Sequence, residues 1–196
     1  MPAMMMRGLL LSVATTTLFG AMTMSCSDPV PPTKQGSFAV HLSAGQGMCG
    51  LAQTFIRVGD ASATAHTAIS DGGATPVNCS VKASGGGFAF SGTIKDQNHN
   101  ILFDVSGTAT PNADSTAALS LSSPDTALNA FGGTCTISVT KTDAQPSLSV
   151  APGRIWGSIT CTAITQPGTV PVKTCALSDF DQSKAGGYFV FENCEQ

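Results

Sequence analysis

The chain has 196 residues, of which only 11% are charged, and a formal net charge of −3. Soluble domains usually carry about 25% charged residues. The few cationic residues form no cluster, and the chain has one Trp and one Tyr. This composition argues against a nucleic-acid partner, since such a partner requires a positive patch for phosphates and aromatic platforms for bases. A chain of this length is expected to form one domain with a sizeable core.

Residues 1–25 have the layout of a secretory signal peptide. Arg7 precedes an uncharged, moderately apolar run that continues to Met22 and is interrupted by three threonines. A spanning helix needs about 20 predominantly apolar residues, so this run suits an anchor poorly. Its N-terminal position and polar exit are typical of a cleaved leader. The sequence therefore predicts that the remaining chain is exported.

The stretch Thr23–Cys26 resembles the lipobox of bacterial lipoproteins, in which a small residue precedes the lipid-modified cysteine. Ser25 and Cys26 match that pattern, whereas Thr23 stands where an aliphatic residue is usual. The resemblance implies cleavage before Cys26, lipidation of its thiol and attachment to a membrane. Ser27 follows the cysteine in place of Asp, which implies the outer membrane of a Gram-negative cell. The alternative is an ordinary secreted protein that is cut near Cys26.

Residues 26–35 are polar and rich in proline, as expected of an extended tether between a lipid anchor and a folded domain. From residue 36 onward, apolar and polar residues alternate, and Thr, Val, Ser and Gly dominate. That pattern and composition favour β-strands over helices. The sequence thus predicts three parts: a signal peptide (1–25), a lipidated cysteine with its tether (26–35) and a single β domain (36–196).

The cysteine count supports the assignment of Cys26 to a lipid. An odd number of cysteines is unusual in an exported protein, and removing Cys26 leaves six. An oxidising compartment then favours three disulfides. No two of these six are closer than fourteen residues, a spacing that argues against zinc ligation. The full set is Cys26, Cys49, Cys79, Cys135, Cys161, Cys175 and Cys194.

Strand geometry suggests one disulfide, and proximity along the chain suggests the other two. The alternating segments 134–141 and 154–162 can form a hairpin that places Cys135 opposite Cys161 and Ile137 opposite Ile159. Facing side chains of an antiparallel pair are close enough for a disulfide. For the remaining four cysteines we expect the pairs Cys49–Cys79 and Cys175–Cys194.

Alternating segments along the chain predict an all-β fold, an antiparallel β-sandwich or barrel-like domain cross-linked by disulfides. The clearest hairpin joins 88–95 to 101–109 through a turn at 96–100, which would place Phe90 across from Val105 and Ile94 across from Ile101. The small, polar segment 59–75 is expected to be a loop. Residues 187–193 form the last strand, and their apolar residues on both faces indicate that both faces are covered.

No catalytic or metal-binding pattern stands out, and we expect no cofactor. His41, His66 and His99 lie far apart, and neither G-x-S-x-G nor H-E-x-x-H occurs. A weak resemblance to a calcium loop lacks the glycine at the bend and the bidentate glutamate, so a polar turn is preferred. The oxygen donors of that candidate are Asp96, Asn98, Asn100 and Asp104.

These features favour a membrane-anchored envelope lipoprotein with a non-enzymatic binding or structural role. We expect the protein to contact the membrane through its lipid. An envelope protein or a glycan is the expected further partner. A glycan site would require an exposed aromatic strip or pocket. The single Trp156 and single Tyr188 give only weak support to such a site. The alternative is an exported hydrolase whose catalytic residues converge only in the fold.

Overall fold

The structure is a computed structural model, and it describes residues 30–43, 49, 54–124, 128–169, 172–177 and 186–196. The described residues form fourteen strands and no α-helix, which confirms the all-β, antiparallel fold class. The strands are β1 (Gln35–Ser43), β2 (Thr54–Val58), β3 (Asp60–Ala61), β4 (His66–Thr67), β5 (Ile69–Ser70), β6 (Val77–Ser84), β7 (Gly87–Asp96), β8 (Ile101–Ala109), β9 (Ser115–Ser123), β10 (Leu128–Ser138), β11 (Ser149–Ala151), β12 (Arg154–Gln166), β13 (Lys173–Leu177) and β14 (Gly187–Glu192).

The chain divides into two units, Met1–Pro31 and Pro32–Gln196, and the strands all belong to the second. The folded domain therefore begins before residue 36, the expected boundary. Residues 33–35 belong to it because their backbone is already bound: the carbonyl of Lys34 accepts a hydrogen bond from the N–H of Asp71 at 2.6 Å.

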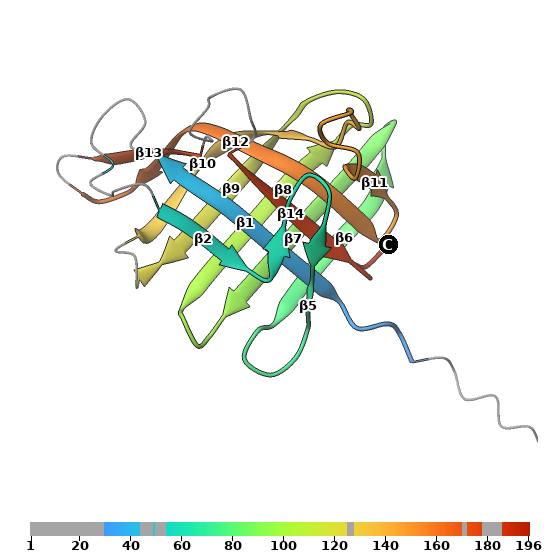
Figure 1. The fold of residues 1–196 in the computed structure, drawn as a ribbon, viewed down its shortest axis with the longest axis horizontal. Coiled ribbons are helices and arrows are strands. Elements are labelled where there is room, and N and C mark those ends of the chain that lie inside the picture. Colours follow the sequence, from blue (N-terminus) through green and yellow to red (C-terminus); the bar gives the residue numbers. More distant parts are fainter. Residues whose placement is uncertain (1–29, 44–48, 50–53, 125–127, 170–171, 178–185) are drawn as a thin grey trace, which may run out of the picture. The chain divides into compact units, whose positions relative to one another are not determined.

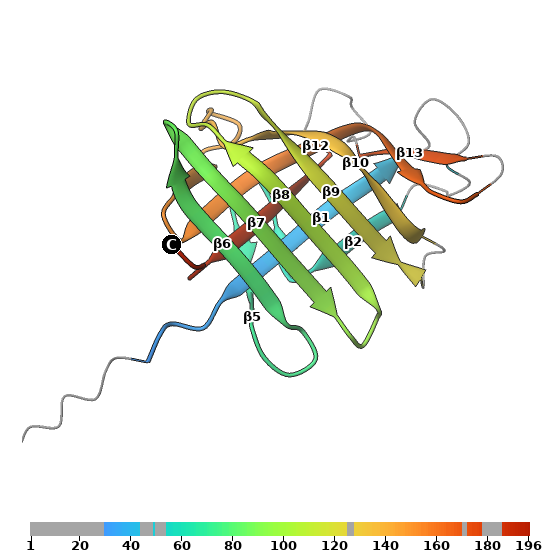
Figure 2. The ribbon, with the colours of Figure 1, turned by 180° about the vertical axis from the view of Figure 1, so that it is seen from behind.

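One large sheet folds over to make two packed layers. Strands β6 to β10 follow one another as an antiparallel meander in the first layer, which faces the viewer in Figure 2. From β10 the sheet continues through β12, β14 and β1 into the second layer, seen in front in Figure 1. Strands β13 and β14 both pair with β1 and with β12, so they share one gap in this layer.

The main core lies between the layers and is built from the inward-facing residues of the alternating strands. Phe38 of β1 stacks on Phe103 of β8 with ring centroids 4.3 Å apart, and Phe90 of β7 lies 6.0 Å from Phe189 of β14. Phe38, Phe103 and Phe189 are fully buried. The period-2 pattern therefore assigns the core-facing side of these strands correctly, because one face of each strand must be dry.

The hairpin of β7 and β8 has the expected inward faces, but its register differs by two residues. Phe90 pairs with Gly107, and Ile94 pairs with Phe103, in place of Val105 and Ile101. Strand β7 extends to Asp96, which pairs with Ile101 and leaves a four-residue turn. The Asp96 carboxylate accepts hydrogen bonds from the backbone N–H groups of residues 98 and 99, so it begins the turn one residue later than expected.

The segment 59–75, expected to be a loop, forms the short strands β3, β4 and β5 and covers the outer face of the second layer. Its small side chains allow close approach: Ala61 is buried, and the Trp156 indole N–H donates to the carbonyl of Ser62 at 3.0 Å. Beneath this cover, Val190 of β14 is fully buried although it faces away from the main core. The expectation that the last strand is covered on both faces is thus confirmed.

The chain end after β14 runs along the outer edge of β6. The N–H of Glu195 donates to the carbonyl of Cys79 at 3.1 Å, and its own carbonyl accepts from the N–H of Val81 at 2.8 Å. The N–H of Gly153 also reaches the carbonyl of Val81. These bonds join the β6 edge of the first layer to the second layer.

Gly92 provides a test of the packing between layers. A Cβ atom at this position would lie 2.3 Å from a ring atom of buried Phe191, and the ring cannot move far in a closed core. We expect Gly92→Ala to lower the free energy of unfolding by about 1–3 kcal/mol, measured by denaturant titration. Ser91→Ala is the matched control, because Ser91 is exposed on the opposite face, and it should change stability by less than about 0.5 kcal/mol. Equal stability of Gly92→Ala and the wild type would contradict this packing.

Candidate functional site

The described residues contain six cysteines, and all six are paired. Cys135 in β10 is bonded to Cys161 in β12, the expected pair, and Ile137 faces Ile159 as the same register requires. The other two expected pairs are wrong. The structure links Cys49 to Cys175 and Cys79 to Cys194.

The two incorrect pairs share one physical cause. Both predictions paired cysteines that are close in the sequence. That rule holds only if segments that are neighbours in the sequence are also neighbours in the fold. In this fold β13 and β14 return to β1, so Cys175 lies beside the chain that follows β1, and Cys194 lies beside β6. The resulting separations are 126 and 115 residues, against 26 for the hairpin disulfide.

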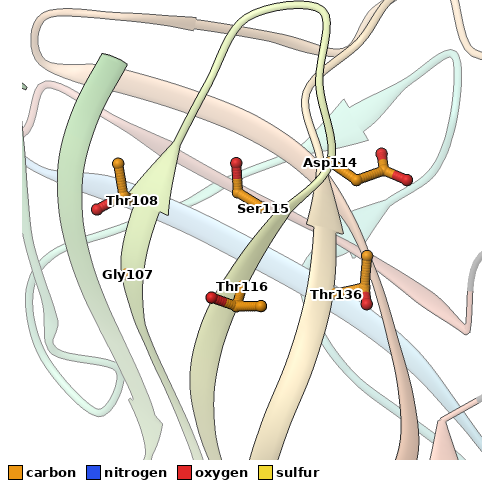
Figure 3. A pocket seen from close by; sticks show the side chains of 6 residues that line it. All are labelled: Gly107, Thr108, Asp114, Ser115, Thr116 and Thr136. Atoms are coloured by element: carbon orange, nitrogen blue, oxygen red, sulfur yellow. The ribbon is translucent and has the colours of Figure 1, made fainter. Parts of the chain in front are cut away.

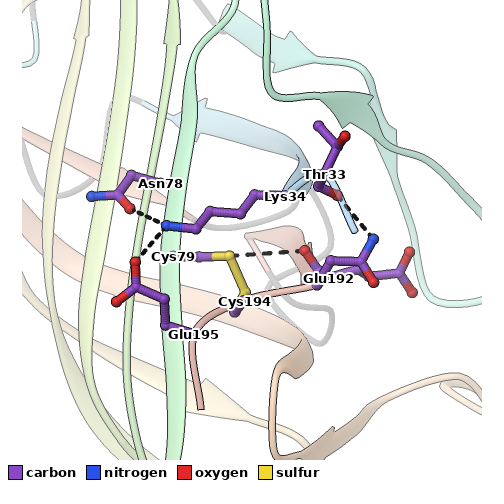
Figure 4. Close-up of a disulfide and its surroundings, with 8 residues drawn as sticks. Thr33, Lys34, Asn78, Cys79, Glu192, Cys194 and Glu195 are labelled. Atoms are coloured by element: carbon purple, nitrogen blue, oxygen red, sulfur yellow. Dashed lines mark hydrogen bonds and ion pairs between the residues drawn. A yellow bond between two sulfur atoms is a disulfide. The ribbon is translucent and has the colours of Figure 1, made fainter. Parts of the chain in front are cut away.

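The start of the domain is held by a polar cluster around the Cys79–Cys194 disulfide, here termed the N-terminal clamp (Figure 4). The Lys34 ammonium donates to the Glu195 carboxylate at 2.7 Å and to the Asn78 side-chain oxygen at 2.8 Å. The Asn193 amide donates to the carbonyl of Thr33 at 2.9 Å. The first residues of the domain are therefore bound to its last residues and to β6. We define the clamp as Thr33, Lys34, Asn78, Cys79, Asn193, Cys194 and Glu195.

The clamp contains a carboxyl group whose pKa is shifted from its ordinary value, that of Glu195. A hydrogen bond from Lys34, with the charge of the same ammonium, lowers the pKa of Glu195 below its usual value of 4.5. Lys82 contributes in the same direction. Since the pKa is depressed on folding, the stabilising contact is complete above about pH 4.5 and is lost as the pH falls through the folded-state pKa. This pair is exposed, so its contribution is screened by solvent.

The four oxygen donors of the candidate calcium loop, at the β7–β8 turn, do not point toward a common centre. Asp96 caps the turn, and the Nδ1 atom of His99 lies 2.7 Å from its carboxylate. Burial raises the pKa of Asp96, but the hydrogen bonds from His99 and from the turn backbone outweigh it and lower the pKa overall. Asp104 lies on the other face of the hairpin, where the Thr93 hydroxyl donates to it at 2.8 Å. Asn98 and Asn100 occupy the turn itself, and Asn100 has the positive φ of 52° that asparagine tolerates.

The histidines contact different neighbours. The Nε2 atom of His66 in β4 lies 3.4 Å from the Glu192 carboxylate, and its ring meets Trp156 edge-on with centroids 4.4 Å apart. His99 belongs to the β7–β8 turn, and His41 projects from β1 beside Phe55 of β2. Trp156 therefore packs under the 59–70 cover rather than between the layers. Among the described residues, no group of three or more His, Cys, Asp or Glu side chains is placed to hold a metal.

A broad depression lies on the outer face of the first layer (Figure 3). It has a volume of about 720 Å³, and its walls come from β8, β9, β10 and the turn before β9. Thr116 of β9 pairs with Thr136 of the adjacent strand β10. Asp114 is the one lining residue that carries a carboxylate. Its hydroxyl groups can donate and accept hydrogen bonds, but its lining has neither a base nor an aromatic ring. The lining residues are Gly107, Thr108, Asp114, Ser115, Thr116 and Thr136.

Comparison with known proteins gives no match to a family model, to a curated protein or to a solved structure. Within the described part of the chain, no helix is long and apolar enough to cross a membrane. A second Asp-rich run that resembles a cation loop, at 179–183, lies outside the described residues, as does Cys26. Sequence reasoning did not identify the clamp, because Lys34 and Glu195 are 161 residues apart and carry no motif.

The disulfide pattern can be checked directly. Non-reducing proteolysis with mass spectrometry of the oxidised protein should yield peptides that link Cys49 to Cys175, Cys79 to Cys194 and Cys135 to Cys161. A peptide that links Cys49 to Cys79 would contradict the order of strands in the second layer, since β13 would no longer lie beside β1.

The ion pair of the clamp can be tested by titration. Lys34→Met should raise the pKa of Glu195 toward 4.5, because it removes both the hydrogen bond and the nearest positive charge. The measurement is the pH dependence of the Glu195 carboxyl ¹³C shift by NMR. Lys95→Met, which removes a lysine that does not contact Glu195, is the control and should leave that pKa unchanged. An unchanged Glu195 pKa in Lys34→Met would show that Lys34 and Glu195 do not form an ion pair in solution.

Proposed function

We propose that this chain is a membrane-anchored lipoprotein of the bacterial envelope, with a domain that serves a non-enzymatic binding or structural role. The observation that carries the proposal is the assignment of the seven cysteines. Six of them form disulfides in the folded domain, and Cys26, which follows Ser25 in the lipobox-like stretch, is the one left over. Disulfides also suit an exported protein, since the cytosol keeps thiols reduced.

The arrangement of the domain start supports the same proposal. Five residues lie between Cys26 and Pro32, the first residue of the folded unit, and the six Cα–Cα steps of this tether span at most about 20 Å. A lipid on Cys26 would therefore hold the domain close to the membrane surface. Any pull on the short tether reaches Thr33 and Lys34 first, and these are the residues that the clamp binds.

The outer membrane is the proposed location, because Ser27 rather than Asp follows the lipidated position. One acyl chain binds a bilayer only marginally, so durable anchoring requires more than one. The three-acyl cysteine of mature bacterial lipoproteins would meet that requirement.

The hydrolase alternative has less support. It requires a nucleophile, a base and an oxyanion site within hydrogen-bond reach in one cleft. The acids that contact His66 and His99 are Glu192 and Asp96, which belong to different layers of the domain. The depression on the first layer has no histidine among its lining residues.

The anchor can be tested by metabolic labelling. Cells grown with labelled palmitate should incorporate label into the wild-type protein, and Cys26→Ala should incorporate none because the acceptor thiol is gone. Ser25→Ala is the control, since it keeps a small residue before the cysteine and should preserve labelling. Undiminished label in Cys26→Ala, or an unlabelled wild type released into the medium, would refute the lipoprotein proposal.

A further inference from the structure

A second, smaller hollow lies on the outer face of the second layer, where β14, β1 and β2 run side by side (Figure 1). Its volume is about 270 Å³, just below the roughly 300–1,000 Å³ of typical ligand sites. Phe55 of β2 and Tyr188 of β14 border it. Asp60 and His41 are among its polar lining residues. The hollow therefore combines aromatic rings with polar groups, which the depression on the first layer does not.

The strand register places the two rings on either side of β1. On β1, Ala39 pairs with Tyr188 on one side, and His41 pairs with Phe55 on the other. The rings therefore lie diagonally across β1, with Ala39 and His41 between them. The Ala39 side chain is only a methyl group, and Gly187 also lines the hollow.

The two rings are presented in different ways. Phe55 is 56% exposed, one of three large apolar residues of the described chain with high exposure, and the Arg57 guanidinium lies 5.9 Å from its ring centroid. Tyr188 is half-buried, and its hydroxyl accepts a hydrogen bond from the Gln145 amide at 3.2 Å. Tyr188 is thus held in place before any ligand arrives, whereas Phe55 leaves apolar surface in water that a ligand could cover.

We propose that this hollow binds one ring of a saccharide. A sugar ring has an apolar C–H face, which suits the rings of Phe55 and Tyr188, and a rim of hydroxyl groups. The exposed Asp60 carboxylate can accept hydrogen bonds from those hydroxyl groups. The volume suits a single ring rather than an extended chain.

This proposal goes beyond the anchored lipoprotein and does not depend on the lipid at Cys26. The hollow would be the binding site for the glycan that is expected from the sequence as one of two further partners. Since the site is a hollow with one open side, we expect weak binding of one terminal or exposed sugar unit, with a Kd of about 1 mM.

The experiment is an NMR titration of the full chain with three disaccharides, namely cellobiose, maltose and N,N′-diacetylchitobiose. We expect at least one to shift the signals of Phe55, Asp60 and Tyr188 saturably. Phe55→Ala should weaken that binding by about tenfold or more, since the ring is the main exposed apolar surface. Asp60→Asn, which preserves the shape, should weaken it by a smaller factor.

Thr116→Ala is the matched control, because Thr116 lies in the depression on the first layer and should not affect binding. Both Phe55 and Asp60 are exposed, so their variants are expected to fold, which an unchanged signal from the Trp156 side chain would verify. Absence of saturable shifts with all three disaccharides would overturn the proposal. So would equal affinity of Phe55→Ala and the wild type, or a loss of binding in Thr116→Ala alone. None of these outcomes alters the palmitate result, so the two proposals fail independently.

Discussion

Two disulfides cross-link the folded-over sheet, one at the seam between its layers and one at its far edge, and the rest of the structure depends on this constraint. Cys135–Cys161 reinforces the pairing of β10 with β12, where the first layer continues into the second. Cys79–Cys194 joins β6, the far edge of the first layer, to the chain that leaves β14. With the seam and the far edge both fixed, the aromatic rings of the two layers stay in contact. Loops of 115 residues and 26 residues correspond to roughly 4–5 and 3 kcal/mol of loop-closure entropy.

The sequence predicts those parts of the fold that arise from local rules. Alternation identifies the buried faces of β7 and β8, because a strand with one dry face must repeat every two residues. The hairpin disulfide follows from the same rule, since Cys135 and Ile137 share a face. The register of β7 and β8 escaped prediction by two residues because the Asp96 side chain, rather than the strand pattern, determines where the turn begins.

The remaining features depend on contacts between distant segments, which a single sequence does not reveal. The return of β13 and β14 to β1 decides the two long-range disulfides, and no spacing rule encodes that return. The segment 59–75 looks like a loop because its residues are small, yet small residues are what allow it to lie flat on β1 and β14. For the aromatic hollow, one signal was present: Ile56 and Val58 face the core, so Phe55 must point outward.

The chain end along β6 has a consequence for how the protein behaves when it is not fully oxidised. An uncovered strand edge presents free N–H and C=O groups and is a template for pairing with another molecule. Glu195 occupies those groups on β6, and Cys194 next to it is covalently linked to that strand. A molecule that has not yet formed this disulfide would hold the segment only by weak, exposed contacts. Oxidation at one bond would then also determine whether newly made molecules remain separate or aggregate through their sheet edges.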